Sequence, residues 1–209
     1  MTETILVPGG RDVRATLDRA RGDASDDAAA RPDAVVVACP PHPQHQGHRG
    51  DARLVAVSDA LTARGVDCLR FDYGPWDDGY GERADTLRAV EWAAERYDRV
   101  GLFGFSFGGA MALLAAAEGA DVDAVSALGP AARLAADLDA AAAFDRVPVP
   151  VQVVYGTRDD VADWEPVVER AREYRQPVVE FAADHFFIGQ EEKVAAAVAD
   201  FLLANLGVE

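Results

Sequence analysis

The feature that most constrains this chain is a glycine-rich serine turn between a buried strand and a helix. Residues 104–108 have the pattern G-x-S-x-G around Ser106. An apolar run at 99–103, typical of a buried strand, precedes the turn, and the alanine-rich stretch 109–117 favours a helix after it. A serine at so tight a turn has a strained backbone that leaves no room for neighbouring side chains, which explains glycine at 104, 108 and 109.

Such a turn also occurs with an incidental serine, so the motif alone does not establish any chemistry. The helix that follows would point its N-terminus at Ser106 and favour negative charge there. The hypothesis that Ser106 is a nucleophile therefore requires a base and an acid elsewhere in the chain.

Apolar runs alternate with helical patterns along the rest of the chain. This alternation predicts an α/β fold, with a mostly parallel central sheet and helices on both faces. Strands are expected at residues 34–38, 66–71, 99–103, 122–128, 149–155 and 178–181, and helices at 51–64, 82–97, 109–117, 131–144, 164–174 and 191–206. Two short runs at 5–7 and 13–17, separated by a Pro-Gly-Gly turn, predict an N-terminal antiparallel hairpin. The polar segment 21–33 is expected to be an exposed loop.

Length and composition indicate one globular domain, residues 1–209, because half of the residues are hydrophobic. No run of about 18 apolar residues predicts a membrane span, and the acidic N-terminus is unlike a secretory signal. We therefore expect a cytoplasmic protein. Its two cysteines, Cys39 and Cys68, are expected to be buried free thiols, although the sequence leaves a disulfide between them open.

The charge balance is strongly acidic. Twenty basic residues face 36 acidic ones, a net charge of −16, and Lys193 is the only lysine. An acidic surface disfavours nucleic acid and anionic membranes as partners. Together with the depletion of lysine, it resembles the proteins of halophilic microbes, in which salt screens the self-repulsion. The sequence leaves open whether the protein forms a homodimer.

Three polar residues follow three different predicted strands, in chain order. Ser106 follows the strand at 99–103, Asp159 and Asp160 follow the strand at 149–155, and His185 follows the strand at 178–181. Reacting groups of such sheets lie at the carboxyl ends of the strands. Histidine suits the role of a base because its ordinary pKa lies near neutrality. We therefore expect a catalytic set in which His185 takes the proton of Ser106 and a carboxylate orients His185.

This order and placement resembles the α/β-hydrolase fold over nearly the whole chain, from about Ile5 to the last helix. Its strongest elements are residues 104–109, the Gly-x-x-Asp spacing at 156–159 and the sequence Asp-His-Phe-Phe at 184–187. The chain resembles in particular the small, lidless, dienelactone-hydrolase-like branch. The resemblance favours Asp159 over Asp160 as the acid, because the Gly-x-x-Asp spacing matches the family.

The chain departs from that branch at Cys39, at Pro41 and over residues 72–81. The branch carries His-Pro-His-Pro after the third strand, whereas Cys39 and Pro41 stand here where histidines are expected. Residues 72–81 differ from the usual arginine-glycine loop. Dienelactone hydrolases proper have a cysteine at the serine position, so Ser106 argues against that specific activity.

An oxyanion hole is expected beside Ser106. One donor would be the backbone N–H of Phe107, the residue after the nucleophile. The second would come from the loop after residues 34–38, where the prolines have no N–H, so His42 and Gln44 remain.

Residues of the same loop and its neighbours are expected to line the substrate pocket: Trp76, Phe186 and His45. The H-x-x-H-x-x-H spacing of His42, His45 and His48 leaves a metal site as an alternative. We expect a polar pocket-lining loop instead, with no metal and no cofactor, because the serine mechanism needs neither.

The residue set predicts a serine hydrolase that cleaves an ester or thioester of a small to medium acyl group, of the carboxylesterase or thioesterase type. The connection between residues 128 and 149 is too short for a sizeable lid domain, which disfavours a lipase. Amide or peptide hydrolysis by the same residues and a non-catalytic binding protein with this fold remain as alternatives. A dinucleotide-binding oxidoreductase is disfavoured because no G-x-G-x-x-G follows the first parallel strand.

Overall fold

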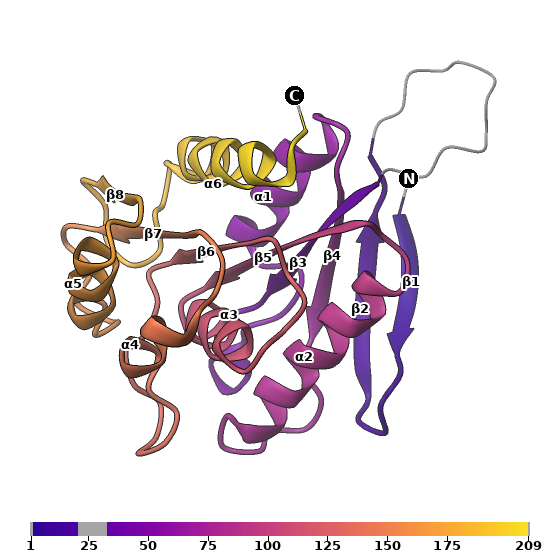
Figure 1. Ribbon diagram of the computed structural model, residues 1–209, viewed down its shortest axis with the longest axis horizontal. Helices are drawn as coiled ribbons and strands as arrows, with labels where there is room; N and C mark the ends of the chain where they lie inside the picture. The colour runs from indigo at the N-terminus through magenta and orange to yellow at the C-terminus, as the bar shows by residue number, and fades with distance from the viewer. Residues whose placement is uncertain (1, 21–32, 209) are drawn as a thin grey trace.

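A single twisted sheet forms the centre of the molecule (Figure 1). The computed structural model describes residues 2–20 and 33–208, so all but the last residue of the loop expected at 21–33 lies outside the described residues. Within these residues eight strands pair in the order β1-β2-β4-β3-β5-β6-β7-β8. The strands are β1 Thr2–Val7, β2 Val13–Asp18, β3 Ala34–Cys39, β4 Asp67–Asp72, β5 Arg99–Phe105, β6 Ala124–Leu128, β7 Val151–Gly156 and β8 Val178–Phe181.

The strand directions confirm the predicted architecture. Strands β3 to β8 are parallel to one another, whereas β1 pairs antiparallel with β2, and β2 pairs antiparallel with β4. The predicted N-terminal hairpin therefore lies at one edge of an otherwise parallel sheet, and β8 lies at the other edge (Figure 1).

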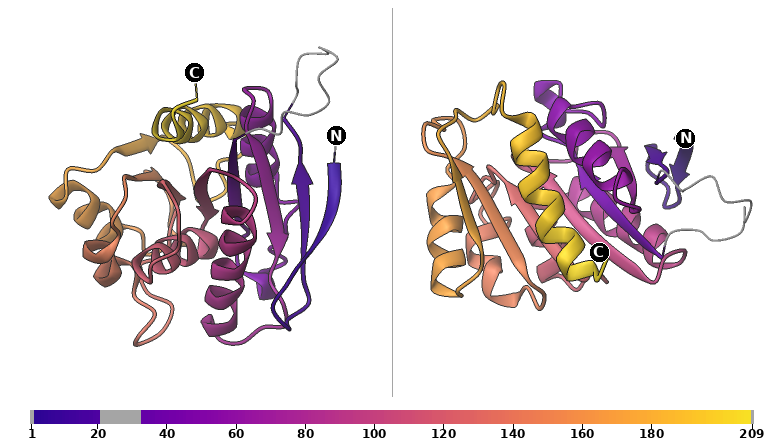
Figure 2. Two further views of the ribbon diagram at one scale, coloured as in Figure 1. Left: turned by 45° about the vertical axis from the view of Figure 1, so that its right-hand side comes forward. Right: turned by 90° about the horizontal axis from the view of Figure 1, so that it is seen from above.

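Helices cover both faces of the sheet. The helices are α1 Ala52–Thr62, α2 Tyr80–Ala94, α3 Phe107–Ala117, α4 Ala140–Ala143, α5 Glu165–Glu173 and α6 Glu191–Leu206, and two 3-10 turns span Pro43–His45 and Phe144–Arg146. Figure 2 shows α1 and α6 side by side on one face. In β3, Val36 and Ala38 pack with these two helices, while Val35 and Val37 pack with α2 and α3 on the opposite face. Such double burial explains why the parallel strands are continuous apolar runs.

The prediction of a helix over residues 131–144 is wrong. Helix α4 begins only at Ala140, where the Asp139 side chain accepts a hydrogen bond from the N–H of Ala142 at 2.8 Å. Upstream, the N–H of Ala132 donates to the carbonyl of Asp163 at 2.9 Å instead of bonding within a helix. Tertiary hydrogen bonds thus override the helix propensity of the alanines, and the connection contains no lid domain.

Both cysteines are free and buried, as predicted. Burial raises the pKa of the Cys39 thiol and that of the Cys68 thiol to about 12 each. Neither side chain is therefore a thiolate near neutral pH.

None of the helices in the described part of the chain is long and apolar enough to cross a membrane.

Candidate active site

Ser106 occupies the predicted tight turn between β5 and α3. Its backbone has φ 56° and ψ −119°, a strained conformation for a residue with a side chain. A Cβ at Gly104 would lie 2.1 Å from the carbonyl oxygen of Gly108, and a Cβ at Gly108 would lie 2.2 Å from that of Cys39. Side chains therefore do not fit at these two positions, and the backbone of Gly108 and Cys39 rather than Ser106 itself excludes them. At Gly109 a Cβ would lie 3.1 Å from the Cβ of Pro130, a tight contact rather than a backbone clash.

Ser106, His185 and Asp159 form one hydrogen-bonded chain. The Nε2 atom of His185 lies 2.9 Å from the Oγ of Ser106, and its Nδ1 atom lies 2.7 Å from the Oδ2 of Asp159. The three residues follow β5, β8 and β7, so the carboxyl ends of three strands bring them together. Asp160 is exposed, and it is Asp159 that contacts the imidazole.

The carboxylate of Asp159 is held on both oxygens. Its Oδ1 accepts hydrogen bonds from the N–H groups of Val161 and Ala162, each at 3.0 Å, while Oδ2 faces His185. Burial by itself raises the pKa of Asp159, but the hydrogen bonds from His185 and from the two backbone N–H groups outweigh burial and hold the pKa below its ordinary value. Asp159 is therefore ionised and oriented at neutral pH.

The loop that carries His185 is fixed from within. The Oδ1 of Asp184 accepts hydrogen bonds from the N–H groups of Phe186 and Phe187 at 3.0 and 3.1 Å. The side chain of Phe187 is fully buried, and the ring of Phe105 packs against His185 with 5.1 Å between the ring centres. His185 is thus 3% exposed and held in place by packing as well as by its partners.

Among the described residues, the backbone N–H groups of Phe107, which follows Ser106, and of His42, which lines the same cavity as Ser106, have no hydrogen-bond acceptor. The N–H of Gln44, the other sequence candidate, donates to the Nδ1 of His42 at 3.2 Å. The N–H groups of His45 and Gly47 both donate to the carbonyl of His42. Of the two candidates in this loop, the geometry thus retains His42 and excludes Gln44.

A cavity of about 350 Å³ opens onto Ser106. Its lining comprises Pro41, His42, His45, Gln46, Gly47, Asp51, Arg53, Phe105, Ser106, Val161, His185 and Phe186. The predicted pocket residues His45 and Phe186 are among them. Two larger hollows, against α2 and α3 and between α1 and α6, do not reach Ser106.

Trp76 does not line this cavity, contrary to the expectation. Its ring packs behind the cavity wall, with ring-centre distances of 4.6 Å to His42 and 5.8 Å to Phe107. The sequence placed Trp76 correctly at a strand end but could not show which side of His42 it occupies.

Sequence reasoning missed an ion pair in the cavity wall. Asp51 caps α1, its side chain accepts a hydrogen bond from the N–H of Arg53, and the two side chains pair at 2.5 Å. The guanidinium of Arg53 also lies 4.6 Å from the ring centre of Phe105. The position of both residues at the start of the helix after β3 is the signal that could have identified them, because helix starts in such sheets face the site.

The histidines after β3 serve the local backbone. The Nδ1 of His42 and that of His48 each accept a backbone N–H from two residues further along, and the rings of His42 and His45 stack at 4.6 Å. Among the residues that the structure describes, no group of three or more His, Cys, Asp or Glu side chains is arranged to hold a metal ion.

The fold and this site define a hydrolase of the α/β type. The family model of the dienelactone hydrolase family matches residues 77–203, more than half of the chain. The chain therefore belongs to the dienelactone hydrolase family. A search of the curated proteins found no significant match.

Solved structures with the same fold include several esterases and hydrolases. Est1E from Butyrivibrio proteoclasticus superposes with a TM-score of 0.78 at 21% identity, over 98% of this chain and 99% of its own. XC6422 from Xanthomonas campestris, an α/β serine hydrolase without a lid, has a TM-score of 0.75 at 21% identity, over 99% and 94%. A dienelactone hydrolase from Anabaena variabilis has a TM-score of 0.74 at 21% identity, over 99% and 98%.

Proposed function

We propose that the protein is a serine esterase or thioesterase that acts through an acyl-enzyme on Ser106. The observation that carries the proposal is the continuous contact from the Oγ of Ser106 through His185 to Asp159, at 2.9 and 2.7 Å. Each member follows a different strand, and the serine is held in a strained backbone conformation at the turn between β5 and α3.

Acylation begins when the Oγ of Ser106 attacks the carbonyl carbon of the substrate and His185 takes the serine proton on Nε2. Asp159 accepts the hydrogen bond of the Nδ1–H and stabilises the imidazolium that forms. The backbone N–H groups of Phe107 and His42 would donate to the carbonyl oxygen as it becomes an oxyanion. Collapse of the intermediate breaks the bond to the alcohol or thiol, which leaves with the proton from His185.

Deacylation repeats the sequence with water. His185 removes a proton from a water molecule, the hydroxide attacks the acyl carbon, and the free acid leaves as Ser106 regains its proton. No further reactant is needed, which is consistent with a hydrolase that has no cofactor.

The cavity supports a small to medium acyl group as the substrate. Its volume of about 350 Å³ is at the lower end of the range for small-molecule sites. Val161 and Phe186 contribute exposed apolar surface to the lining. His45, Gln46 and the Asp51–Arg53 pair contribute polar groups to the same lining, so we propose acyl esters with one polar substituent as the first substrates to test.

The test is labelling with a fluorophosphonate, a reagent that phosphonylates activated serines, followed by intact-mass analysis. High salt is chosen because we propose that a chain of net charge −16 works under screening conditions. One adduct on the wild type and none on Ser106→Ala is the expected result, and a panel of esters, thioesters and amides then resolves the class of bond. A folded wild type without an adduct would favour the non-catalytic binding protein.

A further inference from the structure

The loop that carries Trp76 is held by three side chains from outside it. We call residues 73–79, between β4 and α2, the Trp76 loop, and Arg11, Glu82 and Asp85 the Arg11 cluster. Glu82 accepts hydrogen bonds from the N–H groups of Asp77 and Gly79, at 3.0 and 2.8 Å. Asp85 and Arg11 contact the first half of the loop, at Gly74 and Pro75.

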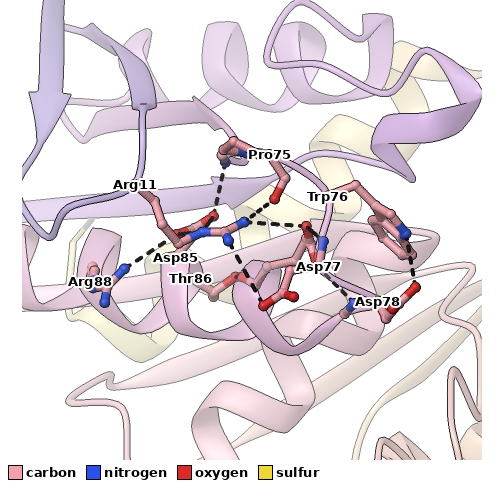
Figure 3. Close-up of polar contacts among 11 residues, drawn as sticks. Arg11, Pro75, Trp76, Asp77, Asp78, Asp85, Thr86 and Arg88 are labelled. Carbon is pink, nitrogen blue, oxygen red and sulfur yellow. Dashed lines mark hydrogen bonds and ion pairs between the residues drawn. The ribbon is translucent and has the colours of Figure 1, made fainter.

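Arg11 lies in the turn of the β1–β2 hairpin and reaches across to the start of the loop (Figure 3). It donates to the carbonyl oxygen of Pro75, while Asp85 accepts a hydrogen bond from the N–H of Gly74 at 2.9 Å. Backbone groups at positions 74, 75, 77 and 79 are therefore all bound by the Arg11 cluster. A seven-residue connection held at four points has little freedom to move.

The charges of the cluster make Arg11 its central member. The side chains of Glu82 and Asp85 are 0% exposed. Arg11 meets Asp85 with Nε, at 2.8 and 3.0 Å from the two carboxylate oxygens, and meets Glu82 at 3.5 Å. Arg88 approaches Asp85 less closely, at 3.6 Å. Buried carboxylates require compensation, so loss of Arg11 would leave both of them short of positive charge.

Space for the Arg11 guanidinium depends on a glycine. A Cβ at Gly81 would lie 2.4 Å from the Cζ of Arg11. Gly81 lies in the first turn of α2, where alanine would otherwise favour the helix. A methyl group at position 81 is therefore a way to displace Arg11 without removing any charge.

Trp76 connects this loop to the candidate oxyanion hole. Its Nε1 donates to Asp78 within the loop at 3.1 Å, and its ring packs on both His42 and Phe107, whose own rings are 4.9 Å apart. These two residues supply the backbone N–H groups assigned above to the oxyanion. A shift of Trp76 would therefore move the two donors relative to Ser106.

We propose that Arg11, Glu82 and Asp85 are positioning residues that hold the oxyanion hole through Trp76, an inference that rests on the proposed function. The cluster touches no reacting atom. Its effect on the rate is transmitted by the Trp76 loop, so it should fall on acylation more than on substrate binding.

The test compares Arg11→Ala with Arg19→Ala. Arg19 follows strand β2, which Arg11 precedes, and pairs at 3.0 Å with another buried carboxylate, Asp67. Asp67 begins β4, whereas the Trp76 loop follows the other end of that strand. Arg11→Ala is expected to slow acylation by a p-nitrophenyl ester about tenfold, with a smaller change in KM, because misplaced donors lose transition-state stabilisation. Arg19→Ala should acylate within about twofold of the wild type at a temperature where both variants are folded.

A double-mutant cycle decides whether Arg11 acts through Trp76. If it does, adding Arg11→Ala to a Trp76→Ala variant should lower the acylation rate by no more than about a further twofold. The proposal is overturned if the fold-losses in acylation rate of Arg11→Ala and Trp76→Ala multiply in the double variant. It is also overturned if folded Arg11→Ala and Arg19→Ala acylate at equal rates. Should Arg11→Ala fail to fold, Arg11→Lys and Gly81→Ala replace it, and Gly81→Ala must slow acylation if the proposal holds.

A spectroscopic readout separates this inference from the proposed function. With 5-fluorotryptophan in place of tryptophan, the ¹⁹F resonance of Trp76, assigned from Trp76→Phe, should shift in Arg11→Ala and Gly81→Ala and stay in place in Arg19→Ala. An unshifted resonance in both cluster variants contradicts the link from Arg11 to Trp76. A folded wild type that never acylates overturns the proposed function and this role with it, whereas an active wild type with normal cluster variants overturns the positioning role alone.

Discussion

Two histidine-bearing loops border the same cavity and use their histidines in opposite ways. In the loop after β8, His185 is 3% exposed and its two ring nitrogens face Ser106 and Asp159, which lie 79 and 26 residues away in the sequence. In the loop after β3, His42 and His48 accept backbone N–H groups from only two residues away. Hydrogen bonds to distant side chains thus place His185 where it can transfer a proton, whereas the hydrogen bonds of His42 and His48 stabilise their own turn.

The difference also bears on the histidine spacing. The H-x-x-H-x-x-H pattern at 42–48 leaves a metal site as an alternative in the sequence, whereas in the structure the Nδ1 atoms of two of these histidines accept hydrogen bonds from the turn. His185, alone in its part of the sequence, is the histidine with side-chain partners on both nitrogens.

The largest effect is expected from the loop after β8. His185→Ala should lower kcat/KM for ester hydrolysis about 10⁴-fold or more, because Ser106 loses its proton acceptor. The measurement is steady-state kinetics with a p-nitrophenyl ester, with circular dichroism as the control for folding. A loss of tenfold or less would show that another group, such as His42, can act as the base.

The second-largest loss of activity is expected from Asp159, the carboxylate that contacts His185. Asp159→Asn should lower kcat about 10³- to 10⁴-fold, because the amide no longer stabilises the imidazolium and favours the wrong tautomer of His185. Asp160→Asn, on the exposed neighbour, is the matched control and should stay within about twofold. The reverse order of the two variants would reassign the acid to Asp160.

A smaller effect is expected from the loop after β3. His42→Ala keeps the backbone N–H but removes the acceptor for Gln44 and the ring that packs on Trp76, so acylation should slow about tenfold. His48→Ala removes a comparable local hydrogen bond at an exposed position and should change the rate by less than about twofold. Equal losses in both variants would mean that general loosening of the loop, rather than contact with Trp76, affects the rate.

The smallest expected effect is the contribution of His42 to the pH dependence of folding stability. Burial, followed by the neighbouring His45, lowers the pKa of His42 below its ordinary value of 6.5. Unfolded chains therefore bind more protons at this position as the pH falls below about 6.5, so stability is highest above that pH and decreases as the pH falls through the folded-state pKa. Urea unfolding at pH 7.5 and 5.5 should show a smaller loss of stability for His42→Gln than for the wild type. An identical loss would show that His42 does not resist protonation in the folded state.

Predictions from local sequence were accurate where one local pattern decides the outcome. The hairpin at β1 and β2, the strand at β8 and the long helix α6 all lie at or near the expected positions. The helix expected at 131–144 was wrong because Ala132 bonds to Asp163, a partner that no local pattern contains. The prediction that Trp76 lines the pocket was wrong for a related reason. Whether the Trp76 ring faces the cavity or packs behind His42 depends on how two separate loops pack together.

Sequence patterns alone predicted the parallel sheet, the strained turn at Ser106 and the three strand ends that carry the candidate triad. These features follow from periodicity, glycine spacing and chain order, which are local or topological properties. The tertiary structure was needed to show that the N–H of Gln44 is already bound to His42 and that Arg11 reaches the Trp76 loop, and it places Asp159, which the resemblance already favoured over Asp160, against His185. The contacts of Asp159 and Arg11 join residues 26 and 64 positions apart in the sequence, so no local pattern contains them.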